Sequence, residues 1–323
     1  MLKRLLLSNS SLYFFALPVL AIATVYYSYN THQLEYNETM AIIRLKPLFD
    51  SFGLIYSTLI FWSLTTIMAV LFIPMLSSRF GMFESGIFQS SLFWLSLLQF
   101  YGFVSGEFQP ILAAVLTLPL FYFLFGMYKS EFASHLLFNA SILVSITSLF
   151  YLPALFSILL VWIGWLLYNP FSFRTFLLSL IGAMLPFLFA VSIYYLNDEL
   201  EFLQNIYSLK IKEAFPETNI SWYLYIGLIG LFTFAGIFRL FLHGFVKKIG
   251  IRKNFTLLIL SFVLFAALFL LYKDTAFIAF LLFPASMLIN LHFTNINRRR
   301  IYEILFIILA GMMFAIPYLP IKP

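Results

Sequence analysis

Long apolar stretches recur from one end of the chain to the other, and charged residues, proline or glycine separate them. A helix that crosses the hydrocarbon core of a bilayer needs about 20 mostly apolar residues. The pattern therefore predicts an all-α integral membrane protein with about 10–11 transmembrane helices. The predicted spans are residues 12–29, 54–76, 87–104, 111–128, 136–152, 153–168, 175–196, 222–242, 255–272, 276–293 and 301–319.

Composition excludes a water-soluble fold. Of the 323 residues, 63% are hydrophobic and 10% are charged, against about 25% charged residues in ordinary soluble domains. So few polar side chains cannot cover a surface that faces water. We therefore expect a single transmembrane helical domain over residues 1–323, with no soluble domain. The absence of cysteine excludes disulfides, thiolate metal sites and iron–sulfur clusters.

Residues 136–168 are the ambiguous part of the predicted topology. No charged residue lies between His135 and Asn169, and the only break is Tyr151-Leu152-Pro153. Each half is short for a span perpendicular to the bilayer. Two short spans and a re-entrant hairpin both fit this pattern.

The distribution of charge predicts the orientation. Cytoplasmic loops of membrane proteins are enriched in Lys and Arg. With eleven spans and the N-terminus inside, most of the 19 Lys and Arg residues fall on the inner side and most of the 13 Asp and Glu residues on the outer side. Counting residues 136–168 as one span would destroy this asymmetry. We therefore predict that the N-terminus is inside and the C-terminus outside. The basic charge is then explained by anionic lipid, and no nucleic-acid partner is expected.

Two long outer loops, residues 30–53 and 197–221, carry charges of both signs. In the first loop, Glu35 and Glu38 are three residues apart, so they would share one face of a helix. Two such carboxylates can hold a divalent cation, or raise the pKa of one of them for work as a base. A solvated charged loop is the alternative. No haem, flavin or nucleotide motif occurs, so a divalent metal ion is the only cofactor that the sequence suggests.

Lys273-Asp274 fills a very tight predicted outer turn between two spans, which places the pair close to the bilayer surface. One interpretation is a lysine that binds a phosphate group, because Lys and Arg are strong charged donors to phosphate oxygens. The alternative is a simple stop signal between two helices.

Polar residues inside the predicted spans are few. We expect them to be hydrogen-bond partners between helices more than a substrate path; they are Gln89, Gln99, Asn139, Ser141 and Asn290. The predicted topology also separates the histidines: His32 lies outside, and the other three lie at or near the inner face. A shared four-histidine metal site is therefore not expected.

Several motifs resemble one family. They are residues 139–155, 168–174 and 185–187, the Ser8-Asn9 end of the basic N-terminus, and Phe283-Pro284. The chain resembles an uncharacterised family of polytopic inner-membrane proteins from Bacteroidota, the DUF6427 family, over most of its length. These motifs are structural, so the resemblance implies membership and a membrane fold but no activity.

The central stretch is also similar, more distantly and in layout, to the small-residue hairpin of GT-C glycosyltransferases. Those enzymes take a sugar from a polyprenyl-phosphate donor and place an acidic residue in the first outer loop. Glu35 and Glu38 occupy that place here, although the usual aspartate is absent. The resemblance implies that Glu35 or Glu38 acts as general base or metal ligand. It implies that the donor phosphate is held by one or more of Arg44, Lys46, Lys210, Lys212 and Lys273, beside Asp274.

Three hypotheses about function stay open. The first is a GT-C-like protein that binds or uses a polyprenyl-linked sugar. The second is a non-catalytic subunit of an envelope secretion or assembly complex, whose partners are other membrane proteins. The third is a transporter or flippase, although no ionisable residue lies at the centre of a predicted span, as an ion-driven carrier usually needs.

Overall fold

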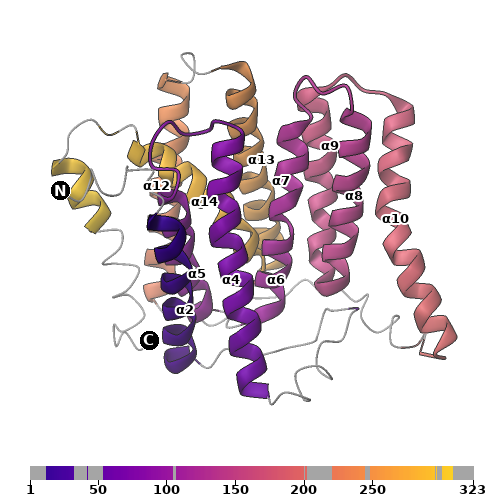
Figure 1. Cartoon of the computed structure of the whole chain (residues 1–323), viewed down its shortest axis with the longest axis horizontal. Coiled ribbons are helices and arrows are strands. Elements are labelled where there is room, and N and C mark those ends of the chain that lie inside the picture. The colour runs from indigo at the N-terminus through magenta and orange to yellow at the C-terminus, as the bar shows by residue number, and fades with distance from the viewer. Residues whose placement is uncertain are drawn as a thin grey trace. The chain divides into compact units, whose positions relative to one another are not determined.

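A computed structural model describes residues 12–32, 42, 54–104, 107–199, 201, 220–243, 248–294, 296 and 300–307 (Figure 1). The regular elements of this part are helices. They are α2 (Leu12–His32), α4 (Leu54–Arg79), α5 (Gln89–Val104), α6 (Phe108–Leu116), α7 (Leu118–Gly126), α8 (Ala133–Phe150), the 3-10 helix η1 (Leu152–Phe156), α9 (Ser157–Tyr168), α10 (Phe173–Leu196), α12 (Ile220–His243), α13 (Ile249–Tyr272) and α14 (Phe277–Thr294). Residues 300–307 are also helical.

These helices fall on the predicted apolar runs, and the predicted all-α class is confirmed. Among the described residues, six helical stretches are long and apolar enough to cross a membrane. They are Leu59–Arg79, Phe108–Gly126, Ala133–Phe150, Phe173–Leu196, Ile249–Tyr272 and Phe277–Thr294. The protein is therefore a helical membrane protein. The number of spans and their orientation stay predictions.

The chain forms two compact units that alternate along the sequence. Unit 1 consists of Met1–Leu34, Leu59–Gly106 and Lys212–Pro323, and unit 2 of Glu35–Thr58 and Glu107–Ile211. Unit 1 thus contains α2, most of α4, α5 and α12 to α14. Unit 2 contains α6 to α10 with η1.

Helix α14 is the centre of unit 1. It packs against α5, α12 and α13, while α2 packs against α5. Nearly every residue from Phe277 to Phe293 is buried. Gly236 allows close contact between α12 and α14, because a Cβ atom added there would overlap the carbonyl oxygen of Leu288 in α14. The backbones of α12 and α14 therefore approach each other at this point, as small residues permit in membrane helix pairs.

Helix α8 is the centre of unit 2, where it packs against α6, α7, η1, α9 and α10. At its end Tyr151 has an extended backbone (φ −152°, ψ 105°), and η1 and α9 then turn back along α8. The break predicted at Tyr151–Pro153 is therefore where the helical hairpin turns. The two arms are separate helices, which agrees with two short spans and also with a re-entrant hairpin.

The surfaces of these helices are apolar. In α10, for example, Ile181, Leu188 and Phe189 are 56%, 65% and 65% exposed. Such a surface costs free energy in water and costs none in hydrocarbon, where lipid chains are as apolar as leucine. The exposed faces therefore agree with a bilayer as the solvent of this protein.

Candidate functional site

Most of the predicted site residues lie outside the described part of the chain. They are Glu35, Glu38, Arg44, Lys46, Lys210 and Lys212. Within the first predicted outer loop, residues 30–32 are the end of α2, and beyond them only Ile42 is described. Its N–H donates to the carbonyl oxygen of Leu149 at 2.8 Å, and the Tyr194 hydroxyl donates to its carbonyl oxygen. Ile42 is thereby fixed to the ends of α8 and α10 in unit 2.

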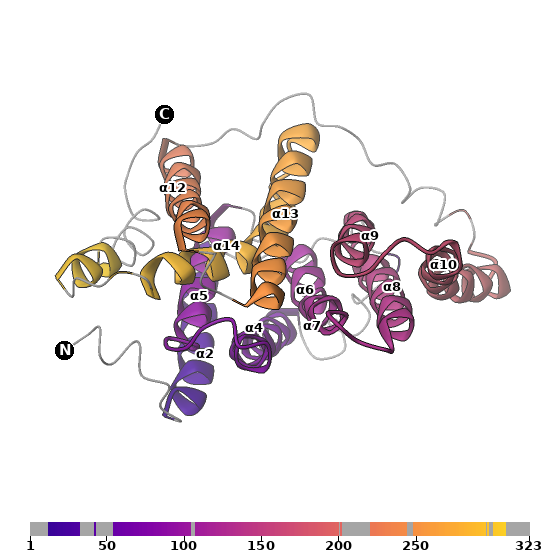
Figure 2. The same ribbon diagram turned by 90° about the horizontal axis from the view of Figure 1, so that it is seen from above.

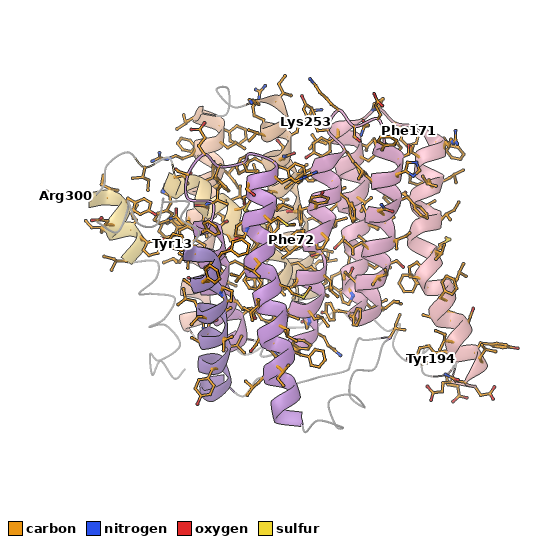
Figure 3. All side chains as sticks on the ribbon, in the orientation of Figure 1. Tyr13, Phe72, Phe171, Tyr194, Lys253 and Arg300 are labelled. Atoms are coloured by element: carbon orange, nitrogen blue, oxygen red, sulfur yellow. The ribbon has the colours of Figure 1, made fainter. Side chains whose placement is uncertain are left out.

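This attachment brings three segments to one end of unit 2. Ile42, the end of α8 and the end of α10 are all predicted to lie on the outer side, and in unit 2 they lie together. Phe171, which precedes α10, lies at the opposite end of unit 2 from Tyr194 (Figure 3). At the Phe171 end, Lys129 belongs to the turn between α7 and α8, and Arg174 belongs to the first turn of helix α10.

Lys273 and Asp274 are described, and they form the turn that joins α13 to α14 in unit 1. Lys273 has a left-handed backbone (φ 53°, ψ 32°), and its N–H donates to the carbonyl oxygen of Phe269 at 2.8 Å. An Asp274 carboxylate oxygen accepts a hydrogen bond from the Ala276 N–H at 3.2 Å. Lys273 therefore ends one helix, and Asp274 caps the entry to the next. The ends of α4 and α12 and the start of α13, which carry basic residues, lie at the opposite end of unit 1 (Figure 1).

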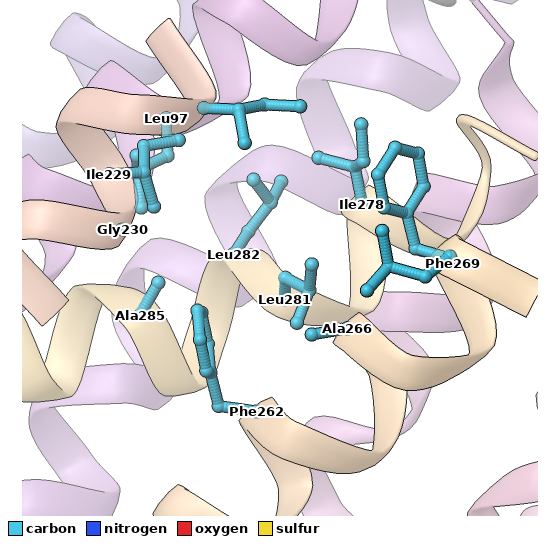
Figure 4. Close-up of a pocket in the computed structure, with 12 residues that line it drawn as sticks. Leu97, Ile229, Gly230, Phe262, Ala266, Phe269, Ile278, Leu281, Leu282 and Ala285 are labelled. Carbon is cyan, nitrogen blue, oxygen red and sulfur yellow. The ribbon is translucent and has the colours of Figure 1, made fainter. Parts of the chain in front are cut away.

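An apolar groove of about 200 Å³ lies between the helices of unit 1 beside this turn (Figure 4). We call it the α12–α13 groove. It is lined by Ile226, Ile229 and Gly230 of α12, by Phe262, Ala266, Phe269 and Leu270 of α13, by Ile278, Leu281, Leu282 and Ala285 of α14, and by Leu97 of α5. The lining contains no polar side chain, so an occupant can be held only by packing.

Small residues on three different helices create this space. Gly230, Ala266 and Ala285 all line the groove, and each has a side chain smaller than leucine. A Cβ atom added at Gly230 would meet no atom within 4 Å. A dry space of this size inside a protein would cost about 5 kcal/mol in lost packing, at roughly 24 cal/mol per Å³. We therefore expect hydrocarbon to fill it in the membrane.

Residues that line the groove lie directly before and after the turn in the sequence. Phe269 and Leu270 lie in the last turn of α13, and Ile278 lies in the first turn of α14. Lys273 follows Leu270 by three residues and ends α13. The chain therefore brings a basic residue next to one end of the apolar groove, which suits a ligand with an anionic group attached to a hydrocarbon chain.

Three buried side-chain amides of unit 1 donate hydrogen bonds to other segments. The Gln89 side-chain amide donates to the Tyr302 hydroxyl at 2.6 Å, and the Asn290 amide donates to the Gly86 carbonyl oxygen at 3.1 Å. Gln99 donates to the Thr24 carbonyl oxygen at 2.8 Å. All three bonds join different segments, as the sequence predicted for buried amides.

Two other polar residues differ from that prediction. Ser141 bonds to the carbonyl oxygen of Leu137 in its own helix, and Asn139 is exposed on α8. A hydroxyl can satisfy itself on the preceding turn of its own helix. Asn139 lies on the exposed face of α8, so its amide does not point into the helix packing. Hydropathy alone does not tell the exposed face of an apolar helix from its buried face.

The described histidines do not form a cluster. His292 of α14 packs edge-on against the ring of Phe232 in unit 1, while His135 is exposed on α8 of unit 2. The side chains of His32 and His243 lie outside the described set. Among the described residues, no group of three or more His, Asp and Glu side chains is placed to hold a metal ion.

Sequence reasoning identified the turn but missed the groove. The signal that could have found it is the set of Gly227, Gly230 and Gly236 within one apolar span, because glycine is costly in a helix unless close packing or open space requires it. In the structure, Gly236 allows close packing against α14, and Gly230 leaves open space in the groove. The pattern could not tell which glycine has which role, since that depends on the neighbouring helices.

The fold is that of a helical membrane protein, and an apolar groove lies between α12 and α13. The chain matches no protein-family model, no curated protein and no solved structure. The resemblances to the DUF6427 family and to GT-C enzymes therefore stay predictions, and the residues of the chain itself carry the functional argument.

Proposed function

We propose that this chain is a multi-pass protein of the cell inner membrane that binds a polyprenyl-phosphate-linked sugar at the outer face. In this proposal the N-terminus is inside, eleven helices cross the bilayer, and the Lys273–Asp274 turn is on the outer side. The protein is then GT-C-like in its lipid donor, and Glu35 or Glu38 is the base or metal ligand. Membership of the Bacteroidota family named above is part of the same proposal.

One observation carries the proposal: a lysine ends α13 within one turn of an entirely apolar groove. A polyprenyl phosphate has a charged group at one end and a branched hydrocarbon chain behind it. Lysine is a good partner for the phosphate, and only packing against apolar side chains can hold the chain. Ile42 contacts the ends of α8 and α10, so in this proposal the three segments share the outer side.

Mass spectrometry of the protein, purified gently from its native membrane, tests this function. We expect a polyprenyl-phosphate sugar to remain bound at near-stoichiometric amounts. A stoichiometric protein without any such lipid would contradict the proposal, and it would favour the non-catalytic subunit of an envelope complex. A lipid-linked sugar that the protein carries across vesicle membranes unchanged would instead identify a flippase.

Substitution of Lys273 separates its charge from its role in the turn. We expect Lys273→Gly to raise the free energy of unfolding by about 1 kcal/mol, because glycine adopts the left-handed backbone without the cost that other residues pay. The same variant should bind farnesyl phosphate several-fold more weakly, as measured by titration in detergent. Lys273→Arg should retain most of the binding.

Lys129 offers a matched control for this experiment. It also has a left-handed backbone (φ 58°), but it lies in unit 2 in the turn between α7 and α8. Lys129→Gly relieves the same backbone strain and loses a contact of the ammonium group with the Tyr128 ring at 5.6 Å. Its binding of farnesyl phosphate should equal that of the natural protein. Equal weakening in both glycine variants would show that Lys273 has no specific role.

A further inference from the structure

We propose that the α12–α13 groove admits one hydrocarbon chain of a membrane lipid sideways, between α12 and α13, and that Gly230 sets the width of this entrance. Helices α12 and α13 both pack on α14, but they stand apart from each other on the same side of it (Figure 2). The floor of the groove is buried, for example at Leu282 and Leu97, whereas Leu270 at its edge is 63% exposed. The groove is thus open at its side.

The chemistry of the walls restricts the occupant to hydrocarbon. An extended peptide would bring N–H and C=O groups into a space without any polar side chain, which is prohibitive at membrane depth. A partner helix with its side chains is about 10 Å across. Even a short piece of such a helix has a larger volume than the groove, which holds about 200 Å³. A single lipid chain has neither problem, and it already surrounds a protein embedded in a bilayer.

The volume limits how much of a chain can enter. A cavity of about 150 Å³ in a protein core accommodates benzene, with its six carbon atoms. By proportion a space of about 200 Å³ takes roughly eight carbon atoms. The groove would therefore hold only the first part of a long lipid chain, and the remainder would lie in the bilayer.

Lys273 determines the orientation of the bound lipid. It follows the groove residue Leu270 by three positions, so an anionic head group lies at the Lys273 end while the chain extends along α13 and α14. This step rests on the proposed function, because it takes the lipid to be a polyprenyl phosphate. The lateral slot itself rests only on the groove.

Two glycines of α12 provide the variant and its control. A Cβ atom at Gly230 or at Gly227 would meet nothing within 4 Å, so neither position is closed to a side chain by its immediate neighbours. Only Gly230 lines the groove, whereas Gly227 is exposed away from it. Leucine at residue 230 would occupy the groove, and leucine at residue 227 would face lipid.

The probes are farnesyl phosphate and farnesol, titrated into the full-length protein in detergent and followed by native mass spectrometry. We expect Gly230→Leu to weaken the binding of both probes by roughly tenfold or more, since most of the buried apolar contact is lost. Gly227→Leu should bind as the natural protein does. Ala266→Leu, on the opposite wall, should reproduce the effect of Gly230→Leu and protects the test against a folding defect in one variant.

The outcomes separate the slot from the proposed function. Unchanged binding of farnesol to both Gly230→Leu and Ala266→Leu would overturn the slot, even if a polyprenyl sugar co-purifies from the native membrane. Loss of binding in these variants, without any polyprenyl lipid in the native preparation, would establish the slot and remove the proposed function. Equal weakening in Gly227→Leu would also overturn the slot, because that side chain lies outside the groove.

Discussion

Gly236→Ala is expected to lower the free energy of unfolding by about 3 kcal/mol, at the upper end of the range for an overpacked core position. The added methyl group would overlap the carbonyl oxygen and carbon of Leu288, which are backbone atoms of the neighbouring helix α14. No rotamer change can relieve such a clash. Helix α12 would have to move away from α14, and the packing around Gly236 would be lost.

Gly227→Ala is the control for this prediction, because it lies in the same helix and a Cβ atom there meets nothing within 4 Å. Alanine favours a helix over glycine by about 1 kcal/mol. We therefore expect Gly227→Ala to be neutral or slightly stabilising. The measurement is thermal unfolding in detergent, followed by intrinsic tryptophan fluorescence. The same midpoint for both variants would contradict the close approach of α12 and α14.

Phe293→Ala is expected to have a comparable effect, about 3 kcal/mol, through lost packing. Phe293 is fully buried at the end of α14, where its ring contacts those of Phe93, Phe232 and Tyr302 at centroid distances of 5.0, 5.8 and 5.5 Å. Transfer from water contributes little in a membrane, so the cost comes from the cavity and from the lost ring pairs. Four segments of unit 1 meet at this ring.

Phe293→Leu separates the volume of this side chain from its aromatic contacts. Leucine fills most of the space, so we expect it to recover more than half of the stability lost in the alanine variant. Both variants can be compared by the unfolding midpoint and by the monodisperse fraction on size exclusion. A midpoint for Phe293→Ala within 1 °C of the natural protein would contradict a packed cluster at this site.

The sequence located the helices well and their ends less well. The run that begins at Phe255 is part of a helix that begins at Ile249 and includes the basic residues Arg252 and Lys253. A charged residue marks where a helix leaves the hydrocarbon, and it does not stop the helix itself. Hydropathy therefore underestimates the length of a helix that extends beyond the bilayer.

The predicted span 111–128 shows a second limit. It consists of α6 and α7, with Thr117 between them. Pro119, near the start of α7, has no N–H to continue the hydrogen bonding of α6. The sequence contains this signal, but a hydropathy run passes over a single proline, because prolines such as Pro18, Pro74 and Pro186 also lie within described helices.

The candidate site divides in the same way. The sequence identified Lys273-Asp274 as a tight turn between two spans, since two charges between long apolar runs allow little else. It did not identify the groove, because Gly230, Ala266 and Ala285 are ordinary residues of apolar helices. Their common feature is a position in space, on three helices that surround one volume.

The amino-acid sequence is enough to predict a helical membrane protein with many spans, because only helices satisfy the backbone of long apolar runs in hydrocarbon. It does not predict that α14 is buried while α10 is mostly exposed, or that a groove opens between α12 and α13; these features depend on how the helices pack. A lipid and a protein interior are equally apolar. Hydropathy cannot distinguish them, so steric fit at residues such as Gly236 chooses which face of each helix meets another helix.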